Sequence, residues 1–132
     1  MNYAILLSGG MGNRINSDVP KQYIRVGGCM MITSALKRLI ACAHIDRIVI
    51  VAEESWRGRI DDDCDGVGLA MDKVTGYADP GANRQLSIYN GMRAVMKNVI
   101  ADGVNGMGDD DTVLVHDAAR PFITAKLLDR CY

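Results

Sequence analysis

The sequence lacks three features that would each point to a class of protein. Its formal net charge is only −1, so it has no basic excess of the kind that binds nucleic acid or an anionic membrane. It has no apolar run long enough to span a bilayer, and its first residues enter a short apolar run without the basic leader of a signal peptide. We therefore expect neither nucleic acid nor a membrane as a partner. If a polyanion binds, local geometry has to hold it.

The cysteine pattern also excludes a common class of site. The four cysteines contain no C-x-x-C pair and match no zinc-binding pattern; they are Cys29, Cys42, Cys64 and Cys131. We expect free thiols in a reducing cytoplasm. What the chain does have is an ordinary globular composition, 48% hydrophobic and 23% charged, in 132 residues that suit one domain.

Strand-like and helical patterns alternate along the chain. Apolar, β-branched runs predict buried strands at Tyr3–Leu7, Arg47–Ala52 and Thr112–Val115, with a further short strand near 72–75. Apolar residues at helical spacing predict helices at 31–43 and 83–99 and the start of one at 124, whereas 56–68 has no clear pattern. The alternation predicts an α/β fold with a Rossmann-like, mainly parallel sheet.

The last predicted helix has no C-cap glycine or other stop signal before Tyr132. We therefore expect residues 1–132 to be part of a single domain that continues beyond this point, so that its C-terminal part is missing.

The first predicted strand ends in a glycine-rich loop, Ser8-Gly9-Gly10-Met11-Gly12. Backbone N–H groups in such a loop can close on phosphate oxygens, although a tight strand-to-helix turn explains the glycines equally well. Arg14 and Lys21 favour phosphate contact, because two cations beside oriented N–H groups suit a triphosphate; the alternative is two solvated surface cations. The loop is not a Walker motif, since Asn13 follows the last glycine, and Ile15 breaks the dinucleotide pattern.

A second group of polar residues follows the predicted strand at 112–115. Asp117 would lie on the same rim of the sheet as the glycine loop, where a carboxylate can hold Mg²⁺ against nucleotide phosphates. Capping of the next segment is the alternative role for Asp117. We expect Arg120 to brace this loop and His116 to be a packed or hydrogen-bonded residue at the strand end.

Two further patterns are weaker. Residues 81–87 (GANRQLS) form a helix entry that could border a nucleobase, but Asn83 would serve equally well as a helix N-cap. The aspartate runs 61–63 and 109–111 lack metal-ligand spacing, and we expect both to be solvated turns.

Taken together, these segments resemble the cytidylyltransferase family that includes 2-C-methyl-D-erythritol 4-phosphate cytidylyltransferase and ribitol-5-phosphate cytidylyltransferase. The resemblance runs along nearly the whole chain. The motifs that carry it, in order, are the glycine loop with Arg14, Pro20-Lys21-Gln22-Tyr23, Arg84 with Ser87, and His116-Asp117-Ala118-Ala119-Arg120-Pro121.

The resemblance implies a role for each matching position. The backbone of Ser8, Gly9, Gly10, Met11 and Gly12 would wrap the phosphates of CTP, and Arg14 and Lys21 would be the catalytic cations. Gly81, Arg84 and Ser87 would lie around the cytosine, Ala118 would line the ribose and base pocket, and Asp117 would hold Mg²⁺.

The implied reaction joins CTP to 2-C-methyl-D-erythritol 4-phosphate, a step toward isoprenoid precursors, and releases pyrophosphate. Two alternatives stay open: ribitol 5-phosphate as the acceptor, and a nucleotide-binding module without turnover. The loop reads Ser8-Gly9-Gly10 where the methylerythritol enzymes usually have two alanines and a glycine, which is nearer the ribitol type. Pro20–Tyr23 and 116–119 favour the methylerythritol type.

The family resemblance also implies a missing second half. That half would carry another metal-binding aspartate, a further catalytic lysine, the acceptor contacts and an arm exchanged across a homodimer. We therefore expect the 132 residues alone to be nearly inactive.

Overall fold

The computed structural model describes residues 1–9, 19–101, 103, 106–120 and 123–132. Four strands form one parallel sheet in the order β5-β4-β1-β6: β1 (Asn2–Leu7), β4 (Arg47–Val51), β5 (Val74–Ala78) and β6 (Thr112–Asp117). The helices are α1 (Met31–Ala41), α2 (Glu54–Gly66), α3 (Arg84–Ala101) and α4 (Ala125–Arg130). A 3₁₀ turn, η1 (Lys21–Tyr23), leads into a short hairpin of β2 (Arg25–Val26) and β3 (Cys29–Met30). The predicted α/β class and mainly parallel sheet are confirmed.

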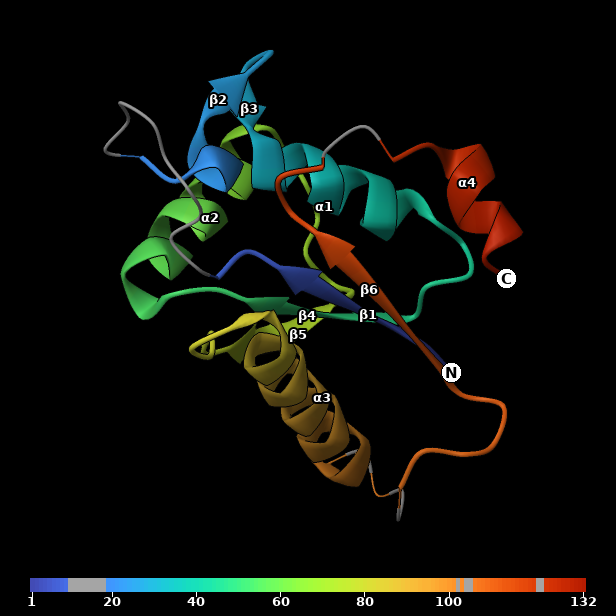
Figure 1. The fold of residues 1–132 in the computed structure, drawn as a ribbon. Coiled ribbons are helices and arrows are strands. Elements are labelled where there is room, and N and C mark those ends of the chain that lie inside the picture. Colours follow the sequence, from blue (N-terminus) through green and yellow to red (C-terminus); the bar gives the residue numbers. More distant parts are fainter. Residues whose placement is uncertain (10–18, 102, 104–105, 121–122) are drawn as a thin grey trace.

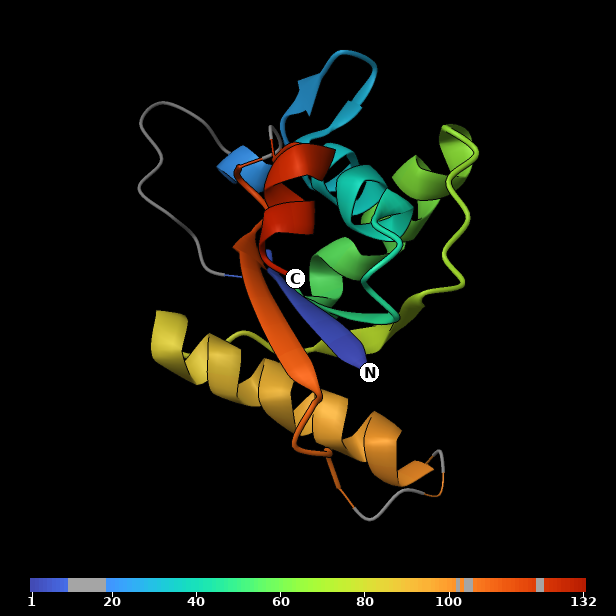
Figure 2. The same ribbon diagram turned by 90° about the vertical axis from the view of Figure 1, so that its right-hand side faces the viewer.

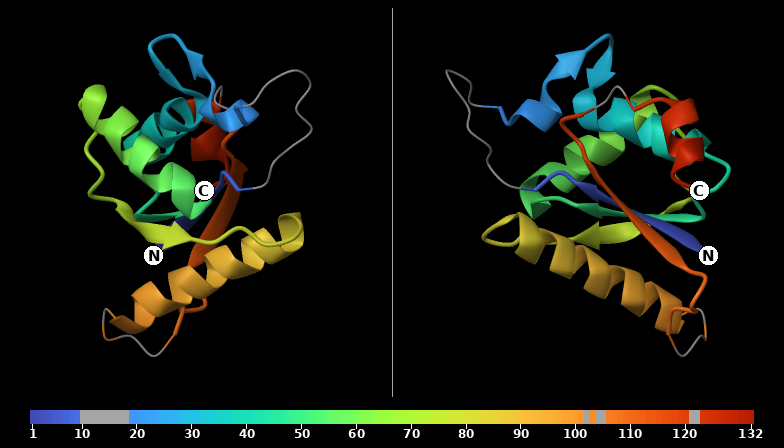
Figure 3. Two further views of the ribbon diagram at one scale, coloured as in Figure 1. Left: turned by 90° about the vertical axis from the view of Figure 1, so that its left-hand side faces the viewer. Right: turned by 45° about the vertical axis from the view of Figure 1, so that its right-hand side comes forward.

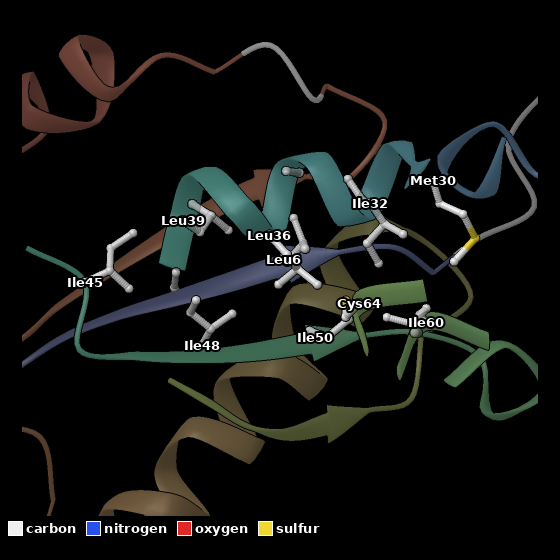
Figure 4. Packing of buried hydrophobic residues seen from close by; sticks show 14 of the residues in the cluster. Leu6, Met30, Ile32, Leu36, Leu39, Ile45, Ile48, Ile50, Ile60 and Cys64 are labelled. Carbon is white, nitrogen blue, oxygen red and sulfur yellow. The ribbon is translucent and has the colours of Figure 1, made fainter. Parts of the chain in front are cut away.

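The helices cover both faces of the sheet (Figures 1 and 2). On one face α1, α2 and α4 contribute to a core in which Leu36 and Leu39 pack with Leu6 and Ile48 of the sheet (Figure 4). On the other face α3 packs against the strand side chains that point away from the first core. There Val95 and Val99 of α3 form a second buried cluster with residues of β1 and β4 such as Ile5 and Val49. Because β1 and β4 are covered on both sides, they need the continuous apolar runs that made them predictable.

A glycine lets α3 approach the sheet closely. A Cβ built on Gly91 would lie 2.8 Å from Ile5 Cγ2 and 3.1 Å from Val51 Cγ2, both on the central strands. The contact brings α3 down onto the sheet. Because α3 follows the parallel strand β5 in the chain, its start lies near the carboxyl ends of the strands.

The region 56–68, left unassigned from the sequence, is the helix α2. Its polar, glycine-containing sequence hides the pattern because only Ile60, Asp63 and Cys64 are buried. The prediction of a solvated turn at 61–63 was therefore wrong, since these aspartates lie within α2. The run at 109–111 does lie in a turn before β6, as expected.

Asp63 has a defined structural role. Its carboxylate accepts hydrogen bonds from the Met30 backbone N–H (2.9 Å) and the Thr33 hydroxyl, and it pairs with Arg25. Burial would raise the pKa of the Asp63 carboxyl, but these three partners outweigh burial and hold its pKa below the ordinary value. Because α1 has no side-chain cap of its own, Asp63 caps it from α2.

The described residues contain no helix that is long and apolar enough to cross a membrane. All four cysteines are within the described residues and are free thiols, and three of them, Cys29, Cys42 and Cys64, are buried.

Candidate functional site

The candidate site lies at the rim formed by the carboxyl ends of β1, β4 and β6. The chain leaves β1 with the Ser8 N–H bonded to the Val51 carbonyl (2.8 Å), and it leaves β6 with the Ala118 N–H bonded to the Leu7 carbonyl (2.8 Å). These bonds hold the two segments after the strands side by side. This is the edge at which open parallel sheets bind ligands.

A cavity of about 570 Å³ opens at this rim. Its walls come from the ends of β1 and β6, from η1 and from the start of α3; the lining residues are Leu7, Gly9, Lys21, Gln22, Gly81, Ala82, Asn83, Arg84, Ser87, Asp117, Ala119 and Arg120. Six of the predicted site residues are among them. Two others, Ser8 and Ala118, are buried and do not line the cavity.

Ser8 anchors the turn that carries Lys21. The Ser8 carbonyl accepts hydrogen bonds from Gln22 Nε2 (2.7 Å) and the Tyr23 hydroxyl (2.9 Å). The Ser8 hydroxyl lies 2.7 Å from the same tyrosine oxygen, and it is the donor there because the tyrosine proton goes to the carbonyl. Lys21 itself is exposed at the cavity wall. The sequence did not reveal this anchoring.

Tyr23, which bonds to Ser8, is packed against a second aromatic residue, Trp56. The rings of Tyr23 and Trp56 stack at 4.1 Å with an interplanar angle of 12°. Burial raises the pKa of the Tyr23 hydroxyl, against the lowering effect of its bond with Ser8, so the group stays protonated and keeps its bond to the Ser8 carbonyl. Trp56 comes from the unassigned region, and no sequence signal linked it to the site.

The predicted glycine loop is described only at its start. Gly9 lines the cavity and packs against Pro80, which precedes α3. The remaining loop residues of the prediction, Gly10, Met11 and Gly12, lie outside the described residues, as does Arg14.

The start of α3 forms the opposite wall. Asn83 Oδ1 accepts a hydrogen bond from the Leu86 N–H (2.9 Å), so Asn83 is the N-cap that its sequence position suggested. Ser87 is buried, and its hydroxyl oxygen accepts a hydrogen bond from the Gly81 N–H (2.9 Å). The hydroxyl proton of Ser87 has no acceptor among the described residues, so it can donate to a ligand. A Cβ at position 81 would lie 2.3 Å from Leu86 Cβ and 2.7 Å from the Leu86 backbone carbon, which explains the glycine.

Asp117 ends β6 and faces the cavity. Its Oδ1 pairs with the Arg84 guanidinium, and its Oδ2 lies 3.9 Å from Arg120 Nε. The Arg120 N–H also bonds to the Asp117 carbonyl (3.1 Å), so Arg120 braces this turn as expected. The Arg84–Asp117 pair joins residues 33 positions apart and was not predicted.

The half-buried side chain of His116 bonds to the same turn. Its Nε2 lies 2.8 Å from the Arg120 carbonyl oxygen; since a carbonyl only accepts, the proton is on Nε2. Burial is the main reason that the pKa of His116 is lowered from its ordinary value, so the ring is neutral near pH 7. His116 is thus the hydrogen-bonded strand-end residue that the sequence suggested.

The charges of the cavity suit a polyphosphate. Among the lining residues that the structure describes, Asp117 is the one carboxylate, whereas Lys21, Arg84 and Arg120 contribute three cations. No group of three or more His, Cys, Asp or Glu side chains that could hold a metal ion occurs in the part of the chain that the structure describes. Mg²⁺ is usually held by one or two carboxylates together with substrate phosphates, so a single carboxylate at this rim is compatible with it.

Comparison with known proteins identifies the family of the chain. A sequence model of the family IspD, 2-C-methyl-D-erythritol 4-phosphate cytidylyltransferase, matches residues 3–132. The chain belongs to this family. Its relatives include the 2-C-methyl-D-erythritol 4-phosphate cytidylyltransferases of Thermotoga neapolitana, 34% identical over 98% of this chain and 51% of the relative, and of Geobacillus thermodenitrificans, 35% identical over 97% and 50%.

Solved structures of IspD proteins share the fold. The 4-diphosphocytidyl-2C-methyl-D-erythritol synthase of Anaerococcus prevotii superposes with a TM-score of 0.68 at 24% identity, covering 98% of this chain and 48% of that one. The IspD of Francisella tularensis gives a TM-score of 0.66 at 25% identity, with 97% and 48% covered. The chain thus spans about half the length of the IspD relatives that it matches.

Proposed function

We propose that the chain is the nucleotide-binding part of a cytidylyltransferase that joins CTP to 2-C-methyl-D-erythritol 4-phosphate and releases pyrophosphate. The observation that carries the proposal is the rim cavity, which gathers Gly9, Lys21, Gly81, Arg84, Ser87 and Asp117 from four separate segments. Membership of the IspD family supports the choice of nucleotide and acceptor.

The cations of the cavity would neutralise the triphosphate. Lys21, Arg84 and Arg120 line one space with a single carboxylate, and cations in a partly closed site attract phosphate more strongly than in open water. Gly81 and Ser87 would border the base, where the free proton of the Ser87 hydroxyl is a donor for a pyrimidine oxygen or nitrogen. Arg14 and the residues 10–12 of the glycine loop would complete the phosphate site.

Asp117 is the residue that would hold Mg²⁺. A bound Mg²⁺ would neutralise phosphate charge and help to orient the triphosphate. Because Arg84 pairs with Oδ1 of Asp117, the metal and this guanidinium would share or compete for one carboxylate.

The proposed reaction needs alignment more than proton transfer. An oxygen of the acceptor phosphate forms a bond to the α-phosphorus of CTP, and the bond from that phosphorus to the bridging oxygen breaks, so that pyrophosphate leaves. The second pKa of a phosphate monoester is about 6, so the attacking group is mostly dianionic at pH 7 and needs no general base. Lys21, held at the cavity wall by its anchor on Ser8, would stabilise the extra charge at the phosphorus.

Two further properties are part of the proposal. We place the protein in the cytoplasm, because the buried free thiols Cys29, Cys42 and Cys64 suit a reducing compartment. For a protein of the relatives' full length we propose a homodimer, as the family resemblance implies.

Calorimetry with CTP and Mg²⁺ tests the nucleotide site directly on the 132-residue chain. We expect CTP to bind more tightly than ATP or GTP, and we expect almost no pyrophosphate release by this chain alone, since proximity of both reactants supplies much of such a rate. A folded sample that does not bind CTP would remove the assignment.

The acceptor is tested on a protein that contains this chain and extends to the length of the relatives. Pyrophosphate release from CTP should require 2-C-methyl-D-erythritol 4-phosphate. Release with ribitol 5-phosphate instead would transfer the proposal to the alternative acceptor.

A further inference from the structure

A second hollow, of about 280 Å³, lies at the open edge of the sheet, away from the rim cavity. Its position follows from the topology: β5 is an edge strand, with α2 on one face of the sheet and α3 on the other (Figure 3). We call it the edge hollow; it is lined by Arg57, Tyr77, Ala78, Asp79, Asn90, Arg93, Ala94 and Lys97. It shares no lining residue with the rim cavity.

The edge hollow has a local excess of positive charge. Arg57, Arg93 and Lys97 face one lining carboxylate, Asp79, in a chain whose net charge is −1. Asp79 pairs with Arg57 (2.7 Å), and its carboxylate is 80% exposed. A further acid, Asp61, does not line the hollow but accepts a hydrogen bond from the hydroxyl of its lining residue Tyr77 (2.6 Å).

Arg93 and Lys97 have no acidic partner among the described residues. Arg93 contacts the ring of Tyr89, with its guanidinium carbon 5.9 Å from the ring centre, and Lys97 has no ion pair within the described ranges. The sequence of α3, RQLSIYNGMRAVMKNVIA, contains no acidic residue, so the helix itself cannot neutralise them. Residues four apart lie on the same helix face, so the two cations are neighbours.

The donors in the hollow suit a tetrahedral oxyanion. Arg57 uses Nε for the Ala52 carbonyl (3.1 Å) and one terminal nitrogen for Asp79. Its other terminal nitrogen has no acceptor in the part of the chain that the structure describes. The exposed guanidinium of Arg93 and the ammonium of Lys97 add donors from the opposite side. Guanidinium groups bind phosphate oxygens in pairs of parallel hydrogen bonds.

We propose that the edge hollow binds a small polyvalent phosphate anion, of the class of inorganic phosphate and diphosphate, through Arg57, Arg93 and Lys97. The volume, about half that of the rim cavity, favours such an anion over a whole nucleotide. The site is independent of the proposed catalytic function, because none of its lining residues belongs to the rim cavity.

The edge hollow is nevertheless connected to the rim cavity through the backbone. Asn90 Nδ2 donates to the Asp79 carbonyl (2.8 Å), and the next residues along the chain are Pro80, which packs on Gly9, and Gly81, which lines the rim cavity. An anion bound to Arg57 in the edge hollow would lie beside the Asp79 carboxylate and repel it. Its binding therefore changes the contacts at one end of the loop that walls the nucleotide site.

The test is a titration of the isotope-labelled 132-residue chain with inorganic diphosphate, without metal and at constant ionic strength, followed by amide NMR. We expect saturable shifts at residues 79 and 90–97. The Arg93→Gln/Lys97→Gln double variant should bind at least about tenfold more weakly there, since it loses two charged donors. Both side chains are exposed, so this variant should fold normally.

Two controls separate this site from other effects. Lys37→Gln/Lys126→Gln removes two exposed cations elsewhere and should leave the shifts at 79 and 90–97 unchanged. Lys21→Ala should weaken any diphosphate binding in the rim cavity without changing the edge hollow. Shifts at 79 and 90–97 that survive Arg93→Gln/Lys97→Gln, that vanish in Lys21→Ala, or that never saturate would overturn the proposal.

Discussion

Replacing Gly9 with alanine tests the contact between the end of β1 and the loop before α3. A Cβ on residue 9 would lie 2.2 Å from Pro80 Cβ and 3.0 Å from Pro80 Cγ. Carbon atoms in ordinary contact are about 3.5–4.0 Å apart, so one of the two segments has to move by more than about 1 Å. Both segments are tied to structured neighbours: Ser8 bonds to Val51, and Gly81 bonds to Ser87.

Such overpacking typically costs about 1–3 kcal/mol, and we expect Gly9→Ala to lower the free energy of unfolding by that amount. The assay is equilibrium unfolding in urea. Gly58→Ala is the matched control, because Gly58 is exposed on α2 and its added methyl meets nothing within 4 Å. That variant should instead gain about 0.5–1 kcal/mol from the better helix propensity of alanine.

A second substitution identifies the partner. Pro80→Gly removes the atoms that collide, so in the double variant Gly9→Ala should cost little beyond the effect of Pro80→Gly alone. The interaction energy of the double-mutant cycle should be of opposite sign to the cost of Gly9→Ala and of similar size. A Gly9→Ala protein within about 0.5 kcal/mol of the parent, or a cycle that sums to zero, would refute the reasoning.

Three further outcomes are expected. In a protein extended to the length of the relatives, Lys21→Ala should lower kcat far more than it weakens CTP binding by calorimetry, whereas unchanged turnover would make Lys21 a surface cation. Asp63→Asn should lower the free energy of unfolding at pH 7 by about 1–3 kcal/mol, because Thr33 and the Met30 N–H lose a charged acceptor. Folding lowers the pKa of Asp63, so its stabilising effect is present above the unfolded-state pKa of about 3.9 and is lost as the pH falls through the folded-state pKa. The urea midpoint of the variant should therefore fall less between pH 7 and pH 3 than that of the parent. A thiol reagent should label exposed Cys131 first and leave Cys64 unreacted in the folded state, because burial raises the pKa of the Cys64 thiol to about 11; rapid labelling of Cys64 would contradict its burial.

The sheet was predictable because the sequences of its central strands, β1 and β4, indicate that both are buried. The runs in β1 and β4 are apolar on both faces, so each reads as a buried strand without tertiary information. The helix α2 was not predictable in the same way. Only three of its residues are buried, one of them an aspartate, so its polar sequence resembles that of a loop.

The parts of the site that could be predicted are those whose positions follow from the parallel order of the strands. Asp117 and the described start of the glycine loop, Ser8 and Gly9, lie at the carboxyl ends of neighbouring parallel strands, so they had to meet at one edge, where the register pairs Leu7 with Asp117. The partners of these residues were not predictable. The pairing of Arg84 with Asp117 and the support of Tyr23 by Trp56 depend on where helices α3 and α2 pack, which no local pattern specifies.

The anchoring of η1 on Ser8 also affects which substitutions the site tolerates. The two bonds that hold Gln22 and Tyr23 end on the Ser8 carbonyl, a group that every amino acid provides. An alanine at position 8 would keep both bonds and lose only the contact of the serine hydroxyl with Tyr23. The position of Lys21 is thus independent of the side chain at residue 8, and a family can exchange serine and alanine there over evolutionary time without moving the lysine.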